Sequence, residues 1–223
     1  MAIAVAKLKG YEVMCLCPSG SLSQTDQTIL DQCEVLEKEI WNPVEDFKQY
    51  YVRQDLLLAL RQGNTVHGFA FFKMRLKNEC WYFEVSEMMF LPHIRGQRLS
   101  RQLVALAYKR ARALGHFTQL QFVTLTVNYK AIHGLKKYSF LSKTNSFNGS
   151  SELLRFHKEY CDTNGLSQIP GSHYAIRRAF KPTKVPSHKV SKPHFLPEDF
   201  SDAEGDAFLF TMFMGRRIAD YFT

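Results

Sequence analysis

The stretch FLPHIRGQRLSRQLVALA, residues 90–107, is the most informative part of this sequence. It has the pattern of a strand end, a basic turn around Gly96 and the first turns of an amphipathic helix. The first four N–H groups of a helix have no partner within it, and the helix dipole attracts anions to that end. Arg95, Arg98 and Arg101 would add charged donors that match phosphate oxygens. The stretch therefore predicts a phosphate site, with a solvated surface turn as the alternative.

Composition fits a globular protein with an anionic partner. The chain has 223 residues, 45% of them hydrophobic, which is enough to bury a core in one domain with appendages. The net charge of +8 favours a phosphorylated cofactor, an acidic protein, nucleic acid or an anionic membrane, without choosing among them. The five cysteines form no CxxC pair and have no zinc-like spacing, so we expect no metal site and a reducing, cytoplasmic compartment. No run of about 20 apolar residues occurs, so we expect a soluble protein.

Strand and helix patterns alternate on both sides of the quoted stretch. Apolar periodicity and turn residues predict strands at 11–18, 55–62, 66–76, 79–91 and 119–127, and helices at 25–41, 43–51, 99–114 and 129–138. The order strand, helix, strand, helix from residue 79 onward implies neighbouring parallel strands with a right-handed crossover. Parallel strands bind ligands just beyond their carboxyl ends, where the basic turn lies.

Two stretches in this order of elements, LPHIRGQRLSRQL at 91–103 and NYKAIHGLKKYSF at 128–140, carry short motifs. With the order of the strands and helices around them, they resemble the GNAT superfamily of acyl-CoA-dependent N-acetyltransferases. The pyrophosphate loop of that family usually reads R/Q-x-x-G-x-G/A, and a later segment runs from an Asn, through an Ala, to a terminal Gly-Phe. The first motif falls here on Arg95, Gly96, Gln97, Arg98, Leu99 and Ser100, and the second on Asn128, Ala131, Ser139 and Phe140. The resemblance covers about residues 10–180. It implies an α/β (α+β) fold with a mixed, largely antiparallel sheet, a central parallel pair splayed to form the donor cleft, and helices on both faces.

The chain departs from the family pattern at several positions. Arg98 stands where the loop has its first glycine, and Ser100 where it has Gly or Ala. The backbone N–H groups that cradle a phosphate remain, while the Arg98 side chain either restricts the approach of the phosphate or binds it. Leu135 occupies the position of the tyrosine that often serves as general acid. Tyr138, three residues on, could replace it, or be an ordinary core or surface tyrosine.

The chemistry that the resemblance implies needs a base, because an amine must lose a proton before it attacks a thioester. Glu84 and Glu87 are the candidate catalytic carboxylates on the strand that leads into the loop. Strand alternation predicts that they point to opposite faces, so that at most one faces the cleft. A backbone N–H near Phe90 is expected to polarise the thioester carbonyl. Asn128 would contact the pantetheine arm or help to splay the strands, and it could also cap the following helix.

Two histidines and the C-terminal part of the chain have weaker signals. His67 and His133 have no partner visible in the sequence, and we expect them to be structural or solvated. A helix at 151–165 and a strand at 172–180 would close the domain. We predict a GNAT-like domain at 1–180, a basic Pro-rich linker at 181–197, and an apolar segment at 198–223 that docks on the domain or on a partner subunit in a homodimer.

Three functions fit these observations. The first is an N-acyltransferase that moves an acetyl or acyl group from acetyl-CoA or another acyl-CoA to an amine of a small molecule or protein. The second is a GNAT-fold acyltransferase with acyl carrier protein as donor, as in acyl-homoserine lactone and N-acyl amino acid synthases, because a basic surface suits an acidic carrier. The third is a non-catalytic binding module. We expect neither nucleic acid nor a membrane as partner.

Overall fold

The computed structural model describes residues 2–18, 21–40, 46–77, 80–114, 120–136, 151–180 and 190–214. The chain forms two compact units, residues 1–121 with 213–223 and residues 122–212. None of the helices within the described ranges has the length and apolarity needed to cross a membrane.

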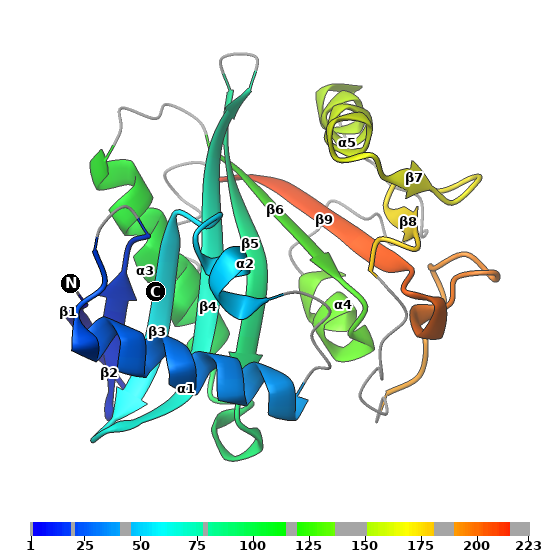
Figure 1. Ribbon diagram of the computed structural model, residues 1–223. Helices are drawn as coiled ribbons and strands as arrows, with labels where there is room; N and C mark the ends of the chain where they lie inside the picture. Colours follow the sequence, from blue (N-terminus) through cyan, green and yellow to red (C-terminus); the bar gives the residue numbers. More distant parts are fainter. Residues whose placement is uncertain are drawn as a thin grey trace. The chain divides into compact units, whose positions relative to one another are not determined.

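The first unit contains a sheet in which neighbouring strands are antiparallel and follow the order of the chain. Its strands are β1 (Ile3–Leu8), β2 (Tyr11–Leu16), β3 (Leu56–Gln62), β4 (Thr65–Lys77) and β5 (Cys80–Phe90) (Figure 1). The sequence predicted all of them except β1. This edge strand, IAVAKL, has no fully buried residue, and its short apolar run does not alternate with polar residues as a half-buried strand would.

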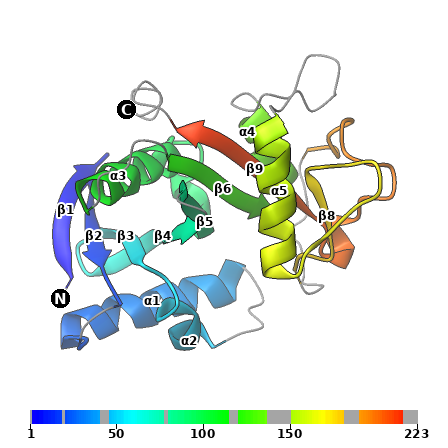
Figure 2. The ribbon, with the colours of Figure 1, turned by 90° about the horizontal axis from the view of Figure 1, so that it is seen from above.

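Helices cover both faces of this sheet. Helix α1 (Gln24–Ile40) and helix α2 (Phe47–Tyr51) lie on one face, and helix α3 (Leu99–Leu114) lies on the other (Figure 2). Ser23 and Asp26 start α1, since the Ser23 Oγ accepts the Asp26 N–H at 3.2 Å and the Asp26 carboxylate accepts the Ser23 N–H at 2.8 Å. The core beneath α1 and α2 is built from apolar and aromatic side chains, among them Ile29, Leu30, Cys33, Leu36, Phe47, Tyr51, Phe69 and Phe71.

The second unit has a sheet with the strand order β6-β9-β8-β7. Strand β8 pairs antiparallel with both of its neighbours. The elements are β6 (Leu120–Thr126), α4 (Tyr129–Lys136), α5 (Ser151–Asn164), β7 (Ser167–Gln168), β8 (Ala175–Arg177), a 3-10 helix η2 (Asp202–Glu204) and β9 (Ala207–Met214). The buried His157 of α5 bonds to the Thr211 hydroxyl of β9 and, at 2.9 Å, to the His173 carbonyl. These bonds hold α5 on the sheet.

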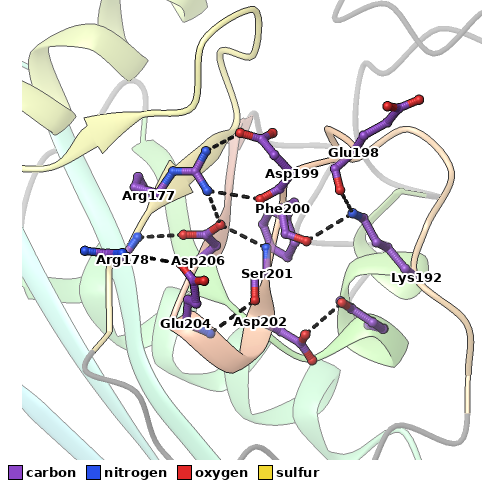
Figure 3. Close-up of polar contacts among 11 residues, drawn as sticks. Arg177, Arg178, Lys192, Glu198, Asp199, Phe200, Ser201, Asp202, Glu204 and Asp206 are labelled. Atoms are coloured by element: carbon purple, nitrogen blue, oxygen red, sulfur yellow. Dashed lines mark hydrogen bonds and ion pairs between the residues drawn. The ribbon is translucent and has the colours of Figure 1, made fainter.

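The segment before β9 is held by the polar contacts drawn in Figure 3. Asp206, fully buried, receives hydrogen bonds from Arg177 at 2.9 Å, from the Arg178 N–H at 2.8 Å and from the Ser201 N–H at 2.9 Å. The Lys192 ammonium donates to the Glu198 and Phe200 carbonyls at 2.7 and 3.0 Å. One buried carboxylate therefore joins β8 to the turn that precedes β9.

Part of the segment predicted as a basic Pro-rich linker is packed. Of residues 181–197 the structure describes 190–197, and within these Pro193, Phe195 and Leu196 are buried. The Phe195 ring packs on Tyr174 and Phe208, and the Tyr174 hydroxyl donates to the Phe195 carbonyl at 2.7 Å. Burial of the apolar side chains of Phe195 and Leu196 therefore packs a segment whose proline and lysine content had predicted an extended linker. The boundaries proposed at 180 and 197 stay predictions.

The predicted fold class is confirmed: the protein is a mixed α/β structure with a large, mostly antiparallel sheet and helices on both faces of it. The splay of the central parallel pair, on which the donor cleft depends, stays a prediction.

Candidate functional site

The basic turn follows β5 directly and leads into α3. A 3-10 helix, η1 (Pro92–Ile94), comes first, and its buried Ile94 fixes the turn to the core. The backbone then takes two left-handed residues, Gly96 at φ +81° and Arg98 at φ +63°. Leu99, buried, begins α3, whose first turn has no acidic side chain. The exposed Arg95 and Arg98 therefore stand beside a helix N-terminus that suits an anion.

The backbone at Arg98 explains the glycine of the family motif at this position. A φ of +63° is the left-handed region, which glycine enters freely and which costs other residues about 1–2 kcal/mol. The turn therefore keeps the conformation that the motif glycine permits, with an arginine in place of it. The turn therefore offers an anion its backbone N–H groups and, in addition, the Arg98 guanidinium.

The turn is braced by its own side chains. Arg95 Nε donates to the Phe90 carbonyl at 2.8 Å, and Gln97 Nε2 donates to the His93 carbonyl at 3.4 Å. Arg95 therefore helps to close the turn, in addition to carrying charge at its edge. The exposed Ser100 lies in the first turn of α3.

A histidine pair fastens the turn to β4. His67 is the extra residue of a β-bulge, because Gly68 pairs with Leu60 while Val66 pairs with Arg61. Its carbonyl accepts the Leu91 N–H at 2.9 Å, and its Nδ1 lies 3.0 Å from His93 Nε2. Burial and the charge of His93 lower the pKa of His67. The sequence shows no partner for His67, and in the structure its partner is His93 of the basic turn. A neutral imidazole suits this hydrogen bond.

A second bulge corrects the prediction for the two carboxylates. On β5, Glu87 pairs with Phe71 and Val85 pairs with Phe72, so Ser86 has no position of its own in the register. Glu84 pairs with Lys73, two residues from Phe71 on β4. Because alternate residues of β4 share a face, Glu84 and Glu87 lie on the same face of the sheet. The expected opposite orientation is wrong, since the extra residue shifts the alternation by one.

This face is the one covered by α1 and α2. Phe71, opposite Glu87, packs against Phe47, Tyr50 and Tyr51 of α2. Burial, the charge of Glu37 on α1 and a hydrogen bond with the Glu37 side chain raise the pKa of Glu87 well above its ordinary value. Glu87 is therefore a carboxyl group that holds a proton more firmly than a surface glutamate does.

Tyr50 and Glu37 are the members of this site that the sequence analysis missed. Burial, followed by the charges of Glu87 and Glu84, raises the pKa of Tyr50, so its hydroxyl stays protonated. The Lys73 ammonium lies 5.8 Å from the centre of the Tyr50 ring. Glu37 did leave a signal, because it follows Leu36 on the buried, apolar face of α1.

Asn128 has the capping role that was one of its two predicted roles. Its Oδ1 accepts the N–H groups of Lys130 and Ala131 at 3.0 and 3.3 Å, at the start of α4. The contact with a pantetheine arm stays a prediction. Tyr138, with Ser139 and Phe140, lies outside the described residues, so its role as general acid stays a prediction too.

Within the part of the chain that the structure describes, no three His, Cys, Asp or Glu side chains gather as metal ligands would.

Comparisons with known proteins concern the fold. No protein-family model matches the chain, and no curated protein does. Solved structures of GNAT acetyltransferases are similar to it. One is the ribosomal-protein-S5-alanine acetyltransferase from Vibrio fischeri, with 8% identity, a TM-score of 0.47, and 95% of this chain and 96% of that chain covered.

Two further structures have comparable coverage. Arabidopsis thaliana Naa50, in complex with the bisubstrate analogue CoA-Ac-MVNAL, is 8% identical with a TM-score of 0.46 over 90% of this chain and 97% of that chain. The IAA acetyltransferase from Bacillus cereus is 11% identical with a TM-score of 0.44 over 91% and 98% of the two chains. The likeness is one of fold and does not assign an activity to this chain.

Proposed function

We propose that this protein is an N-acyltransferase that moves an acetyl or acyl group from an acyl-CoA to an amine of a small molecule or protein. One observation carries the proposal: strand β5 bears Glu84 and Glu87 on a single face and runs directly into a basic, left-handed turn at the N-terminus of α3. A proton acceptor and an anion site are thus fixed on one continuous element.

The turn supplies the donor end of the site. Backbone N–H groups and the exposed guanidinium groups of Arg95 and Arg98 lie around the N-terminus of α3. The residues that we assign to this donor end are Phe90, Arg95, Gly96, Gln97, Arg98, Leu99 and Ser100. These donors match the oxygens of a pyrophosphate. The thioester would then reach back along β5, where a backbone N–H near Phe90 polarises its carbonyl.

The carboxylates supply the acceptor end. Glu84 stands opposite Lys73, whose ammonium compensates its charge, whereas Glu87 faces the Glu37 carboxyl group. A base with a raised pKa takes a proton from an ammonium group more readily than an ordinary carboxylate does. We therefore assign Glu87 as the proton acceptor and Glu84 to the binding of the ammonium.

Arg98 favours an alternative acyl donor, an acylated carrier protein. The prosthetic arm of an acyl carrier protein has one phosphate, which a guanidinium can bind without the close approach that a glycine allows. The net charge of +8 also suits the acidic carrier. A GNAT-fold enzyme with this donor is the alternative to acyl-CoA.

The test is calorimetric titration with CoA, acetyl-CoA and a long-chain acyl-CoA, followed by turnover with a panel of amines. We expect one-to-one binding of CoA, with Arg98→Glu weakening it by about 10-fold or more, because a charge-assisted hydrogen bond contributes about 1.5–3 kcal/mol. Lys109→Ala, an exposed change at the far end of α3, is the control. If acylated carrier protein binds and the CoA compounds do not, the carrier protein is the donor. If neither kind of donor binds, the protein is a non-catalytic binding module.

A further inference from the structure

The hydrogen bond between His67 and His93 ties the basic turn to strand β4. His67 Nδ1 lies 3.0 Å from His93 Nε2, and the two rings meet edge to face with their centres 5.2 Å apart. His93 belongs to η1 at the start of the turn, and its carbonyl accepts Gln97 Nε2 at 3.4 Å. A displacement of His93 would therefore be passed on to the residues that lead into α3.

The backbone of His67 gives the turn a second connection to β4. The His67 carbonyl accepts the Leu91 N–H at 2.9 Å, just where β5 ends. His67 is the extra residue of the bulge between Val66 and Gly68, and a bulge re-aims the side chain that it carries. One residue of β4 therefore holds the turn both by its backbone and by its ring.

The titratable and charged groups around the pair come from β2 and from the turn itself. The centre of the Tyr11 ring of β2 lies 5.3 Å from that of His67, and His93 faces His67 from η1. Arg95, two residues after His93, donates from its Nε to the Phe90 carbonyl at 2.8 Å. None of these three side chains is a carboxylate that would stabilise an imidazolium. Burial and the charge of His93 lower the pKa of His67, so His67 stays neutral into mildly acidic solution.

The protonation state of the two rings decides whether their hydrogen bond exists. A neutral imidazole has one N–H donor and one acceptor nitrogen, whereas an imidazolium has two donors and no acceptor. With one neutral ring, the pair still has a nitrogen that accepts. With two imidazolium rings, both of the nitrogens that meet at 3.0 Å carry hydrogen, and the two positive charges repel each other. Acid therefore breaks this contact once both rings are protonated.

We propose that His67 is a positioning residue for the acyl donor, which holds the basic turn in place through His93 while one of the two rings is neutral and releases it in acid. The inference rests on the proposed N-acyltransferase function and adds to it a residue outside the turn that binds the donor. A charge added at the edge of the turn is screened by water and salt. A released turn no longer directs its N–H groups at one anion. Donor binding therefore weakens in acid, against the direction that added positive charge alone would give.

The first experiment tests the pair without a donor. Nuclear magnetic resonance of the histidine ring protons, followed against pH, should place the midpoint of His67 below its ordinary value of 6.5. In His93→Gln this midpoint should rise, because the like charge beside His67 is removed. Thr65→Ala, an exposed change on the same strand, should leave the midpoint in place. An unchanged midpoint in His93→Gln overturns the proposal.

The second experiment measures donor affinity between about pH 5 and pH 8, the range in which histidine titrates. The ligand is dephospho-CoA, because its pyrophosphate stays ionised throughout and its own charge does not change. Calorimetry should show the wild-type affinity falling by about 2- to 10-fold as the pH is lowered through the His67 midpoint, which is the contribution of one hydrogen bond. His67→Ala should show this weaker affinity at every pH.

His67→Asn provides the conservative replacement. Its amide oxygen takes the place of Nδ1 and accepts a hydrogen bond from His93 whether that ring is neutral or charged. We expect His67→Asn to bind dephospho-CoA as the wild type does near pH 8 and to keep that affinity in acid. Thr65→Ala should follow the wild type throughout.

The outcomes separate this inference from the proposed function. A wild-type affinity that rises steadily toward acid, or an acid loss that persists in His67→Asn, overturns the positioning role. Acyl transfer with pH-independent donor binding keeps the proposed function and overturns this inference alone. A protein that binds no dephospho-CoA at any pH overturns both, even where the first experiment confirms the histidine pair.

Discussion

At the scale of single residues, the most consequential group is Glu87. Its side chain lies under α1 and α2, and burial is the first cause of its raised pKa, followed by Glu37. A folded protein that holds such a proton binds more protons than its unfolded chain does above the ordinary glutamate pKa of about 4.5. The free energy of unfolding therefore falls as pH rises toward the folded pKa. The same burial that prepares the group for proton transfer makes it destabilising at neutral pH.

We expect Glu87→Gln to remove this loss of stability. Its melting temperature should equal that of the wild type near pH 4 and exceed it near pH 8. Each pKa unit corresponds to about 1.4 kcal/mol, or about 3–6 °C in a protein of this size. Thermal unfolding at the two pH values is the measurement. Glu84→Gln is the matched control, because its carboxylate faces Lys73, and an equal gain in both variants would contradict the argument.

At the scale of elements, two bulges bring the site together. The bulge at His67 on β4 accompanies the bond to His93 of the basic turn, and the bulge at Ser86 on β5 turns both carboxylates to one face. Between them, Gly68 pairs with Phe90 at the end of β5. A Cβ at Gly68 would lie 2.5 Å from Phe90 Cδ1 and 2.8 Å from the Met89 carbonyl oxygen. The close approach of the two strands therefore depends on this glycine.

Gly68→Ala should destabilise the protein by about 1–3 kcal/mol, because the clash involves backbone as well as a ring. It should also weaken donor binding, since Phe90 begins the turn. Gly134→Ala is the control: nothing lies within 4 Å of a Cβ at this helical position, so it should be neutral or stabilise by up to about 1 kcal/mol. Chemical denaturation measures both, and a Gly68→Ala protein as stable as the wild type would contradict the packing.

At the scale of the molecule, the second unit depends on a network that joins distant parts of the sequence. Asp206 accepts hydrogen bonds from the Arg177 guanidinium, the Arg178 N–H and the Ser201 N–H (Figure 3). The exposed Asp199 accepts a second hydrogen bond from Arg177. The Tyr129 hydroxyl of α4 donates to Asp202 at 2.9 Å. This network and the aromatic packing of Phe195 hold residues 190–206 against β8.

Asp206→Asn should lower the free energy of unfolding by about 2–4 kcal/mol, because it removes the charge that a buried carboxylate offers to Arg177. Asp199→Asn changes the same arginine's other partner at a side chain that is 62% exposed, and should cost at most about 1 kcal/mol. Urea denaturation followed by circular dichroism compares the two. Equal effects would show that burial does not distinguish these ion pairs.

Much of the fold follows from local patterns. The aromatic and β-branched runs predicted β2 to β6, and helical periodicity predicted α1 to α5, because each pattern depends on neighbours within a few residues. The short edge strands β1 and β7 escaped prediction, since pairing rather than burial defines them. The packing of Phe195 also escaped it, because its ring partners Tyr174 and Phe208 lie more than ten residues away in the sequence.

The sequence by itself determined the basic turn at the head of a helix, the strand that precedes it and the two candidate carboxylates, because spacing and residue type are sufficient for these features. Only the tertiary structure decided that Glu84 and Glu87 share a face, that Glu37 and Tyr50 surround Glu87, and that His67 meets His93. A bulge inserts one residue into a register that depends on the partner strand, and a buried pair needs a helix to close over a sheet. Neither relation exists until distant segments have packed.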